Sequence, residues 1–242
     1  MCTLEKRGRV YLLTLTGSDE HRLNPTTLGS IRSAIAQVRA DSGGRAAALV
    51  TAAEGKFFSN GLDLAWARVS PSDRTRELGS ALRATIADLM SLPMPTIAAV
   101  TGHAAAGGFI IARAHDYVVM RGDRGFVYMS ELDIGVPIAR YAMSVLRSRI
   151  TDARALRDLL LRPEKMKAGE AERMGVIDRA VEGGAEETVA VAVRMAEEMA
   201  AKGWDDSIYA SMRKGAFPQV FRDLGLAEDT DEDISRVFIS KI

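Results

Sequence analysis

The chain has 242 residues, 47% of them hydrophobic, so it can bury a sizeable core, and no break in composition divides it, which predicts one domain. Its 32 Lys and Arg residues balance 32 Asp and Glu residues, which argues against a nucleic-acid-binding protein and for a small-molecule partner. The single cysteine, Cys2, excludes an internal disulfide, and no Cys or His cluster has the spacing of a metal site.

The first third of the chain alternates between strand and helix patterns. Charges interrupt the N-terminal residues, so no signal-peptide core precedes the first expected strand at residues 9–16, and we expect no export. Apolar residues at three- and four-residue steps predict a helix over residues 26–40. Residues 46–51 form an apolar run of buried-strand length, so the order is strand, helix, strand.

The middle third continues this alternation. Helical spacing of leucine and isoleucine predicts a helix over residues 74–92, which Pro93 ends. Residues 109–114 are apolar but too short to assign by periodicity. Strand patterns occur at residues 96–100, 117–120 and 125–129. Together these patterns predict an α/β fold with parallel strands buried under helices.

The last third reads as helical. Helices are expected at residues 152–161, 168–174 and 186–202, and the final forty residues look helical and charged. No apolar stretch approaches the roughly 20 residues that cross a bilayer, so we expect a soluble protein with no membrane partner.

The chain stops at Ser240, Lys241 and Ile242, which differ by one side chain from the Ser-Lys-Leu peroxisomal address. A receptor reads that address at the extreme carboxyl terminus, so the tail predicts contact with a peroxisomal import receptor. A random tail of this composition is about as plausible. Peroxisomal and cytoplasmic localisation therefore both stay open on these residues alone.

A run of small residues, GHAAAGG at 102–108, lies between an expected strand and an apolar segment. Only small residues let a backbone approach a ligand closely. If a helix begins near Gly107, its first N–H groups have no intrahelical partner and suit a developing oxyanion. The alternative is that this glycine pair only allows close packing of a helix on a strand.

The segment KFFSNGLDL at 56–64 is a polar turn after an expected strand. Asn60 and Gly61 permit unusual backbone angles there, so the turn offers a second backbone N–H donor. The alternative is an ordinary loop in which Asp63 caps the following helix.

The segment MSELDIG at 129–135 contains a carboxylate between apolar neighbours. Desolvation raises the pKa of such a glutamate toward the range useful in proton transfer, which makes Glu131 a candidate acid or base. The alternative is a structural acid at a helix N-terminus after Ser130.

These three segments, in this order and spacing, resemble the enoyl-CoA hydratase/isomerase family, also called the crotonase family. Within it the chain looks most similar to the plant peroxisomal Δ3,Δ2-enoyl-CoA isomerases. The resemblance runs from the first strand to about Val181. It implies an α/β fold with a crotonase-like ββα-repeat spiral core over residues 1–182. Residues 183–242 would then form a C-terminal helical trimerisation region within the same functional domain.

The resemblance also implies roles for particular residues. Leu62 and Gly107 would supply the two backbone N–H groups of an oxyanion hole, and Glu131 would be the catalytic acid and base. Hydratases of the family usually carry a second glutamate three residues after the position of Gly107, where this chain has Ile110. One carboxylate suits the transfer of one proton better than the addition of water. The substrate-binding residues would be Lys56, Ser59, Asn60, Gly61, Asp63 and Gly108.

The activity implied is that of a Δ3,Δ2-enoyl-CoA isomerase, which converts 3-cis- or 3-trans-enoyl-CoA to 2-trans-enoyl-CoA in fatty-acid β-oxidation. CoA is part of the substrate, so no separate cofactor is expected, and the family likeness implies a homotrimer or a dimer of trimers. Another reaction on the same scaffold stays open, because a fold does not determine chemistry: hydration, thioester hydrolysis or decarboxylation. A non-catalytic acyl-CoA-binding protein is the third reading.

Other polar residues are given structural roles. His103 lies within the second small-residue segment and is expected to line or pack rather than act as a base. His115 and Asp116 are expected to be neighbours along a strand, pointing to opposite faces. Asp133 is expected at a cap or on the surface.

One departure from the isomerases concerns the segment after Gly135, which is apparently shorter here and begins Val136-Pro137. That segment should shape the acyl pocket, so the preferred chain length stays open. Arg83 and Arg140 cannot be placed relative to the ligand from the sequence.

Overall fold

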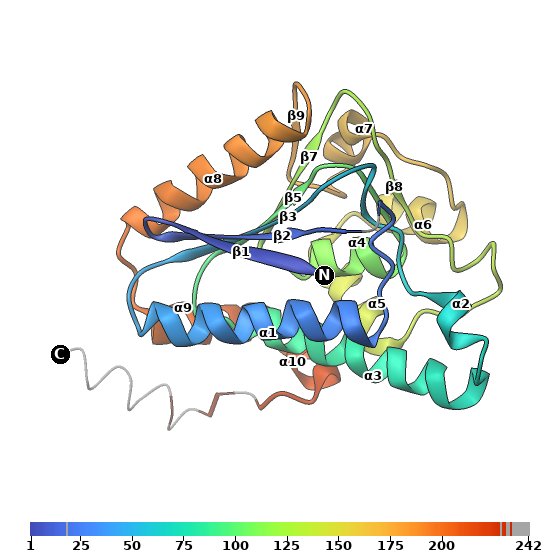
Figure 1. Cartoon of the computed structure of the whole chain (residues 1–242), viewed down its shortest axis with the longest axis horizontal. Coiled ribbons are helices and arrows are strands. Elements are labelled where there is room, and N and C mark those ends of the chain that lie inside the picture. The colour runs from blue at the N-terminus through green and yellow to red at the C-terminus, as the bar shows by residue number, and fades with distance from the viewer. Residues whose placement is uncertain (18, 228, 231–232, 234–242) are drawn as a thin grey trace.

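The structure, a computed structural model, describes residues 1–17, 19–227, 229–230 and 233. Its centre is a six-stranded sheet in the order β1-β2-β3-β5-β7-β9 (Figure 1). The first pair is antiparallel and the others are parallel. The strands are β1 (Cys2–Arg7), β2 (Val10–Leu15), β3 (Ala48–Ala53), β5 (Thr96–Val100), β7 (Tyr117–Arg121) and β9 (Arg179–Val181).

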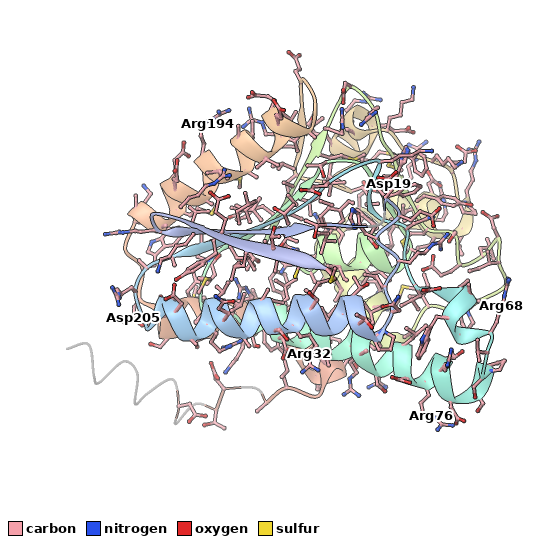
Figure 2. The ribbon with its side chains drawn as sticks, viewed as in Figure 1. Asp19, Arg32, Arg68, Arg76, Arg194 and Asp205 are labelled. Atoms are coloured by element: carbon pink, nitrogen blue, oxygen red, sulfur yellow. The ribbon has the colours of Figure 1, made fainter. Side chains whose placement is uncertain are left out.

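Helices cover both faces of this sheet (Figure 1). On one face lies α8 (Ala185–Ala201), which packs on β2, β3, β5 and β7. On the other face lie α1 (Pro25–Ser42), α3 (Pro71–Met90), α9 (Asp206–Ala216) and α10 (Pro218–Leu224). Charged side chains such as Arg32, Arg76 and Arg194 project outward from this core (Figure 2).

The side chains of β2 point alternately to the two faces of the sheet, and both faces are buried. This explains why the central strands have continuous apolar sequences. Val10 and Leu12 pack into the cluster beneath α8, while Tyr11, Leu13 and Leu15 pack into the larger cluster on the opposite face. Successive side chains of a strand point to opposite faces, and both faces of this sheet are buried.

A second sheet of three parallel strands positions the candidate site. Its strands are β4 (Phe57–Ser59), β6 (His103–Ala105) and β8 (Val127–Tyr128). Each follows a central-sheet strand and precedes a helix: α2 (Leu64–Ala67), α4 (Gly107–Arg113) or α5 (Arg140–Arg149). The chain therefore repeats a strand–strand–helix unit three times. Because the strands are parallel, their carboxyl ends meet at one edge.

Most expected elements are present within a few residues of their predicted bounds. Asn24 caps α1 by accepting the Thr27 N–H, and Asp152 caps α6 (Ala153–Leu161) by accepting those of Arg154 and Ala155. The expected helix at 168–174 is α7 (Ala168–Arg173).

Five elements were missed by the sequence patterns: β1, β4, β6, β9 and α5. β1 is a mostly exposed edge strand, so it lacks the apolar run that marks buried strands. The other three strands are only three residues long, too short to show a period. Their pairing partners, not their own residues, define them.

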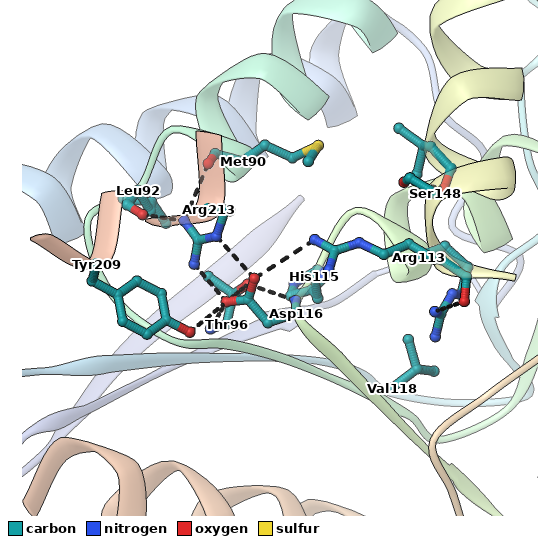
Figure 3. A network of polar contacts seen from close by, with 12 residues as sticks. Met90, Leu92, Thr96, Arg113, His115, Asp116, Val118, Ser148, Tyr209 and Arg213 are labelled. Atoms are coloured by element: carbon teal, nitrogen blue, oxygen red, sulfur yellow. Dashed lines mark hydrogen bonds and ion pairs between the residues drawn. The ribbon is translucent and has the colours of Figure 1, made fainter. Parts of the chain in front are cut away.

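The C-terminal helices belong to the core rather than to an appendage. Arg213 of α9 is 5% exposed, and its Nη2 lies 2.5 Å from the Asp116 carboxylate (Figure 3). The same guanidinium donates to the carbonyl oxygens of Met90, Leu92 and Met94. A buried cation thus joins α9 to the end of α3 and the start of β5.

The expectation that His115 and Asp116 lie along a strand is wrong, because both lie in the turn between α4 and β7. Backbone and side-chain bonds to Thr96 hold Asp116 there. Its carboxylate also accepts a hydrogen bond from Tyr209 at 3.1 Å (Figure 3). The Arg149 guanidinium lies 3.6 Å from the same carboxylate. The expected structural role of the two residues fits these contacts.

No helix in the described part of the chain has the length and apolar character needed to span a membrane. Ser240, Lys241 and Ile242 lie outside the described residues.

Candidate active site

A cavity of about 200 Å³ opens at the carboxyl edge of the three-stranded sheet. Most of its wall is apolar, which is typical of sites that bury an apolar ligand around a few polar groups. The apolar wall includes Leu62, Leu64, Leu82, Ile110, Ile134, Val136, Pro137, Ile138 and Ala142. Polar lining residues include Asn60 after β4, Ser130 and Glu131 after β8, and Arg22, Thr75 and Tyr141 from other segments.

Glu131 follows β8 by three residues and lines this cavity. Bonds from Ile134 N–H to Ser130 O (3.1 Å) and from Val136 N–H to Glu131 O (2.9 Å) close a turn around it. Burial raises the pKa of its carboxyl group. Its Oε2 is buried without a hydrogen-bond partner in the described part of the chain, so one carboxylate oxygen is available to a ligand.

Glu131 is the only carboxylate among the described residues that line the cavity. Ile110, 3% exposed, contributes an apolar side chain to the same wall. Glu131 and Ile110 thus lie in one wall, and the catalytic role of Glu131 stays a prediction.

Leu62 follows β4 by three residues, and its backbone is held by a neighbouring segment. Leu23 N–H donates to Gly61 O, and Asp63 N–H donates to Leu23 O, each at 2.9 Å. These two bonds flank Leu62, so its own N–H faces away from Leu23. Among the described groups none accepts that N–H, which leaves it as a free donor in the cavity wall.

Gly107 follows β6 by two residues and begins α4. The preceding Ala106 has a φ of 50°, a conformation unusual for alanine, and its N–H donates to Tyr128 O at 2.8 Å. The bond from Ile110 N–H to Ala106 O (3.0 Å) starts the helix. The Gly107 N–H precedes that turn and has no acceptor among the described residues.

The Leu62 and Gly107 loops touch at Gly61. A Cβ at Gly61 would lie 3.0 Å from Ala106 Cβ and 3.3 Å from Gly107 N, and the φ of Gly61 is 75°. Only glycine fits both the conformation and the space. The two free N–H donors therefore belong to loops in direct contact, beside one cavity.

His21 and Arg22 support the Leu62 loop, although neither is predicted from the sequence. His21 has a φ of 43°, and its carbonyl oxygen accepts the Ser59 hydroxyl at 2.8 Å. Arg22 lines the cavity and donates to Asn60 O at 3.1 Å. No motif marks them, because they act through backbone contacts nearly forty residues away.

The remaining predicted binding residues divide into two groups. Asn60 lines the cavity. The side chain of Ser59 is buried and bonded to His21, and a Cβ at Gly108 would lie 2.5 Å from Ser59 O, so close packing explains that glycine. The described lining of the cavity includes neither of these two, and their part in holding substrate stays a prediction.

Lys56 and Asp63 also lie outside the described lining, as does Gly61. Asp63 accepts the Trp66 N–H at 2.9 Å and so caps α2, the alternative stated for it. The Lys56 ammonium lies 5.7 Å from the centre of the Phe57 ring. No contact here ties either side chain to the cavity.

His103 and Asp133 are placed away from the cavity wall. His103 packs between the rings of Phe57 and Phe126, with centroids 4.9 and 3.9 Å away, and burial lowers its pKa. Asp133 is exposed and accepts the Tyr128 hydroxyl, which raises the pKa of that tyrosine. Nowhere in the described residues do three or more His, Cys, Asp or Glu gather in a metal-binding group.

Known proteins resemble the chain across most of its length. The family model for enoyl-CoA hydratase/isomerase matches residues 5–224. Enoyl-CoA delta isomerase 1, peroxisomal, of Arabidopsis thaliana is 50% identical over 220 residues, covering 91% of each chain. Enoyl-CoA delta isomerase 2, peroxisomal, of the same plant is 46% identical over 231 residues, covering 93% of this chain and 96% of that protein.

A solved structure of a probable enoyl-CoA hydratase from Mycobacterium tuberculosis matches with a TM-score of 0.84 and 20% identity. The match covers 93% of this chain and 91% of the mycobacterial chain. At this level of sequence identity, structural similarity is evidence for the fold only. It confirms the expected α/β fold with C-terminal helices.

Proposed function

The chain belongs to the enoyl-CoA hydratase/isomerase family, and we propose that it is an enoyl-CoA isomerase, which converts 3-cis- and 3-trans-enoyl-CoA to 2-trans-enoyl-CoA. One observation carries the proposal. Glu131 is the sole described carboxylate in a largely apolar cavity, and two loops with unpaired N–H groups line the same cavity. The names of the two plant relatives agree with it.

The thioester carbonyl oxygen of the substrate would accept hydrogen bonds from Leu62 and Gly107. In a 3-enoyl-CoA the C2 hydrogens are acidified by the thioester and by the adjacent double bond. The Glu131 carboxylate removes one of these protons, and the electron pair of the C2–H bond spreads onto the thioester oxygen as a dienolate. The two N–H donors stabilise that charge, and loss of one such donor typically costs about 3 kcal/mol in the barrier.

The reaction ends when protonated Glu131 returns the proton to C4. A C4–H bond forms, the double bond settles between C2 and C3, and the carbonyl is restored. A raised pKa suits this work, because the same group must act first as a base and then as an acid near neutral pH. The proton moves within one substrate molecule without net oxidation, so we propose that no redox cofactor or metal takes part.

Hydration is the closest alternative reaction. Adding water to a 2-enoyl-CoA requires a group to position and deprotonate the water and a group to protonate C2. Ile110 offers no such group where a second glutamate would lie. The cavity therefore favours proton transfer over water addition.

We propose that the enzyme acts in fatty-acid β-oxidation in peroxisomes. Both plant relatives carry the word peroxisomal in their names. A reporter protein carrying the last ten residues should concentrate in peroxisomes, and a diffuse cytosolic signal would contradict a working address. A homotrimer or a dimer of trimers, as the family likeness implies, is part of the same proposal.

The test of the activity is an assay with 3-cis- and 3-trans-enoyl-CoA, following the absorbance of the conjugated 2-enoyl-CoA. Incubation of 2-enoyl-CoA alone, with detection of 3-hydroxyacyl-CoA, is the hydratase control. We expect conversion in the first assay and little hydration in the second. Turnover in neither assay would favour an acyl-CoA-binding protein.

A further inference from the structure

One wall of the cavity that contains Glu131 has a position without a side chain. Helix α3 contributes Thr75, Gly79 and Leu82 to the lining. Gly79 follows Thr75 by four residues and precedes Leu82 by three, so the three residues lie along one face of the helix. A side chain at position 79 would therefore stand between those of Thr75 and Leu82.

Neither backbone conformation nor packing among the described residues accounts for this glycine. Gly79 lies inside a helix of 20 residues, and its φ is not in the left-handed region. Beyond its own helix, no described atom lies within 4 Å of where its Cβ would stand. A glycine inside a helix lowers the stability of that helix relative to alanine. The fold would thus accept a side chain at position 79.

Tyr141 of α5 joins the two helices at the same point. Its hydroxyl donates to the Gly79 carbonyl oxygen at 3.1 Å, and its side chain also lines the cavity. Burial raises the pKa of Tyr141 to about 12, so the hydroxyl keeps its proton near neutral pH and remains a donor. The open space at Gly79 therefore lies beside a fixed contact between α3 and α5.

We propose that the space at Gly79 holds the part of the acyl chain beyond C4, so that Gly79 determines how long a chain the enzyme converts. This inference rests on the proposed function. With the thioester oxygen at Leu62 and Gly107, C2 and C4 lie at Glu131. The remaining carbons then lie along the rest of the apolar wall, of which α3 and α5 supply a part.

The size of the effect follows from the burial of methylene groups. Each methylene group that leaves water for an apolar wall favours the bound state by about fourfold. A leucine side chain at position 79 would occupy the space of several such groups. Displacing two methylene groups of the substrate would lower kcat/KM about sixteenfold. A chain that ends before the space at Gly79 would lose nothing.

The test compares 3-dodecenoyl-CoA with 3-hexenoyl-CoA, whose chain extends only two carbons beyond C4. The quantity measured is the ratio of kcat/KM for the long chain to kcat/KM for the short chain. We expect Gly79→Leu to lower this ratio at least tenfold and Gly79→Ala to lower it less. Ser80→Leu is the matched control, because Ser80 is an exposed residue of the same helix outside the described cavity lining. It should leave the ratio unaltered.

Urea unfolding distinguishes this role from a structural one. Leucine and alanine both favour helices over glycine, so the two variants at position 79 should unfold at the same or a higher urea concentration than the unaltered protein. The long-chain rate should fall in the same variants. If Gly79→Leu does not fold, the ratio in Gly79→Ala decides, and it must lie below that of the unaltered protein.

The two proposals fail in different ways. If the unaltered protein converts neither substrate, the isomerase function itself is wrong. If it converts only the short chain, the space at Gly79 holds no long chain and this inference is overturned. The same holds if Gly79→Leu leaves the ratio unaltered, whether both rates persist or both fall. The leucine would then point into the outer hollow between α3 and α5 that Gly79 also borders, or obstruct the site as a whole.

Discussion

The side chains of Glu131 and Ile110 face one cavity, the first from the turn after β8 and the second from α4. An acid and an isoleucine thus occupy positions that two carboxylates would share in a water-adding enzyme of the family. The isoleucine leaves Glu131 without a second carboxylate in the described lining, and burial is the largest cause of its raised pKa. Under the proposed mechanism, Glu131 would therefore carry the proton without a second carboxylate.

The change Glu131→Gln should lower kcat for isomerisation by about 10²- to 10⁴-fold, because it removes the only described carboxylate in the cavity. Binding of a CoA ester should be nearly unaltered, because the amide keeps the size of the side chain. Steady-state kinetics and calorimetric binding of a saturated acyl-CoA measure the two effects. Asp133→Asn, an exposed acid two residues away, is the matched control and should keep full activity. Near-full activity of the Gln variant would contradict the role of Glu131 as the catalytic acid and base.

The pH profile of kcat/KM should have an acid limb whose apparent pKa lies above 4.5, the ordinary pKa of a glutamate. The reason is that burial raises the pKa of Glu131. The sign follows from the mechanism: below its pKa the carboxyl is protonated and cannot accept the C2 proton, so activity rises with pH. A profile of initial rates between pH 4 and 8, with circular dichroism to confirm folding at each pH, measures it. An acid limb with an apparent pKa at or below 4.5 would contradict the role of a buried Glu131 as the base.

The change Gly61→Ala should damage both stability and rate. Its Cβ would press on Ala106 at 3.0 Å, and its φ of 75° disfavours any side chain. We expect a loss of about 1–3 kcal/mol in the free energy of unfolding and a clear fall in kcat as the two donor loops separate. Gly29→Ala, in the open middle of α1, should instead stabilise by about 0.5–1 kcal/mol. Equal effects of the two changes in urea unfolding would argue against contact between the loops.

The change Arg213→Met should lower the free energy of unfolding by about 3–5 kcal/mol, because it leaves Asp116 short of a partner in the core. Arg194→Met removes an exposed ion pair with Glu187 and should cost less than about 1 kcal/mol. Urea unfolding of the two variants provides the comparison. A small effect at Arg213 would mean that Arg149 alone satisfies the carboxylate.

Acid should destabilise the fold through His115, whose pKa burial lowers from 6.5 to about 4. Between these values the unfolded chain binds a proton that the folded chain does not, so stability falls as pH falls. From pH 7 to pH 5 the loss amounts to about 2 kcal/mol from this residue. His115→Gln should remove that part of the pH dependence in urea unfolding. An unaltered slope in the variant would show that other groups cause it.

Much of the fold follows from local patterns. The helices α1, α3 and α8 and the strands β2, β3, β5 and β7 carry long apolar periods or runs, and burial against the central sheet keeps those patterns intact. The second sheet does not follow from them, because strands of two or three residues gain their identity from neighbours distant in the chain.

The candidate site shows the same division. Leu62, Gly107 and Glu131 are predictable, because each stands in a motif whose order along the chain matches the family. His21 and Arg22 are not, since their contacts with the Leu62 loop depend on how two separate segments meet.

The clamp around Arg213 has a consequence for how the chain is made. The carbonyl oxygens that it satisfies belong to residues synthesised 119 to 123 positions earlier, and Asp116 precedes it by 97. Before α9 is synthesised these carbonyl oxygens have no cation to donate to them, so burying them at that stage would be unfavourable. The central sheet can form early, but the face that α9 helps to cover is complete only after α9 has been synthesised. Satisfaction of these carbonyl oxygens by Arg213 therefore follows the synthesis of α9.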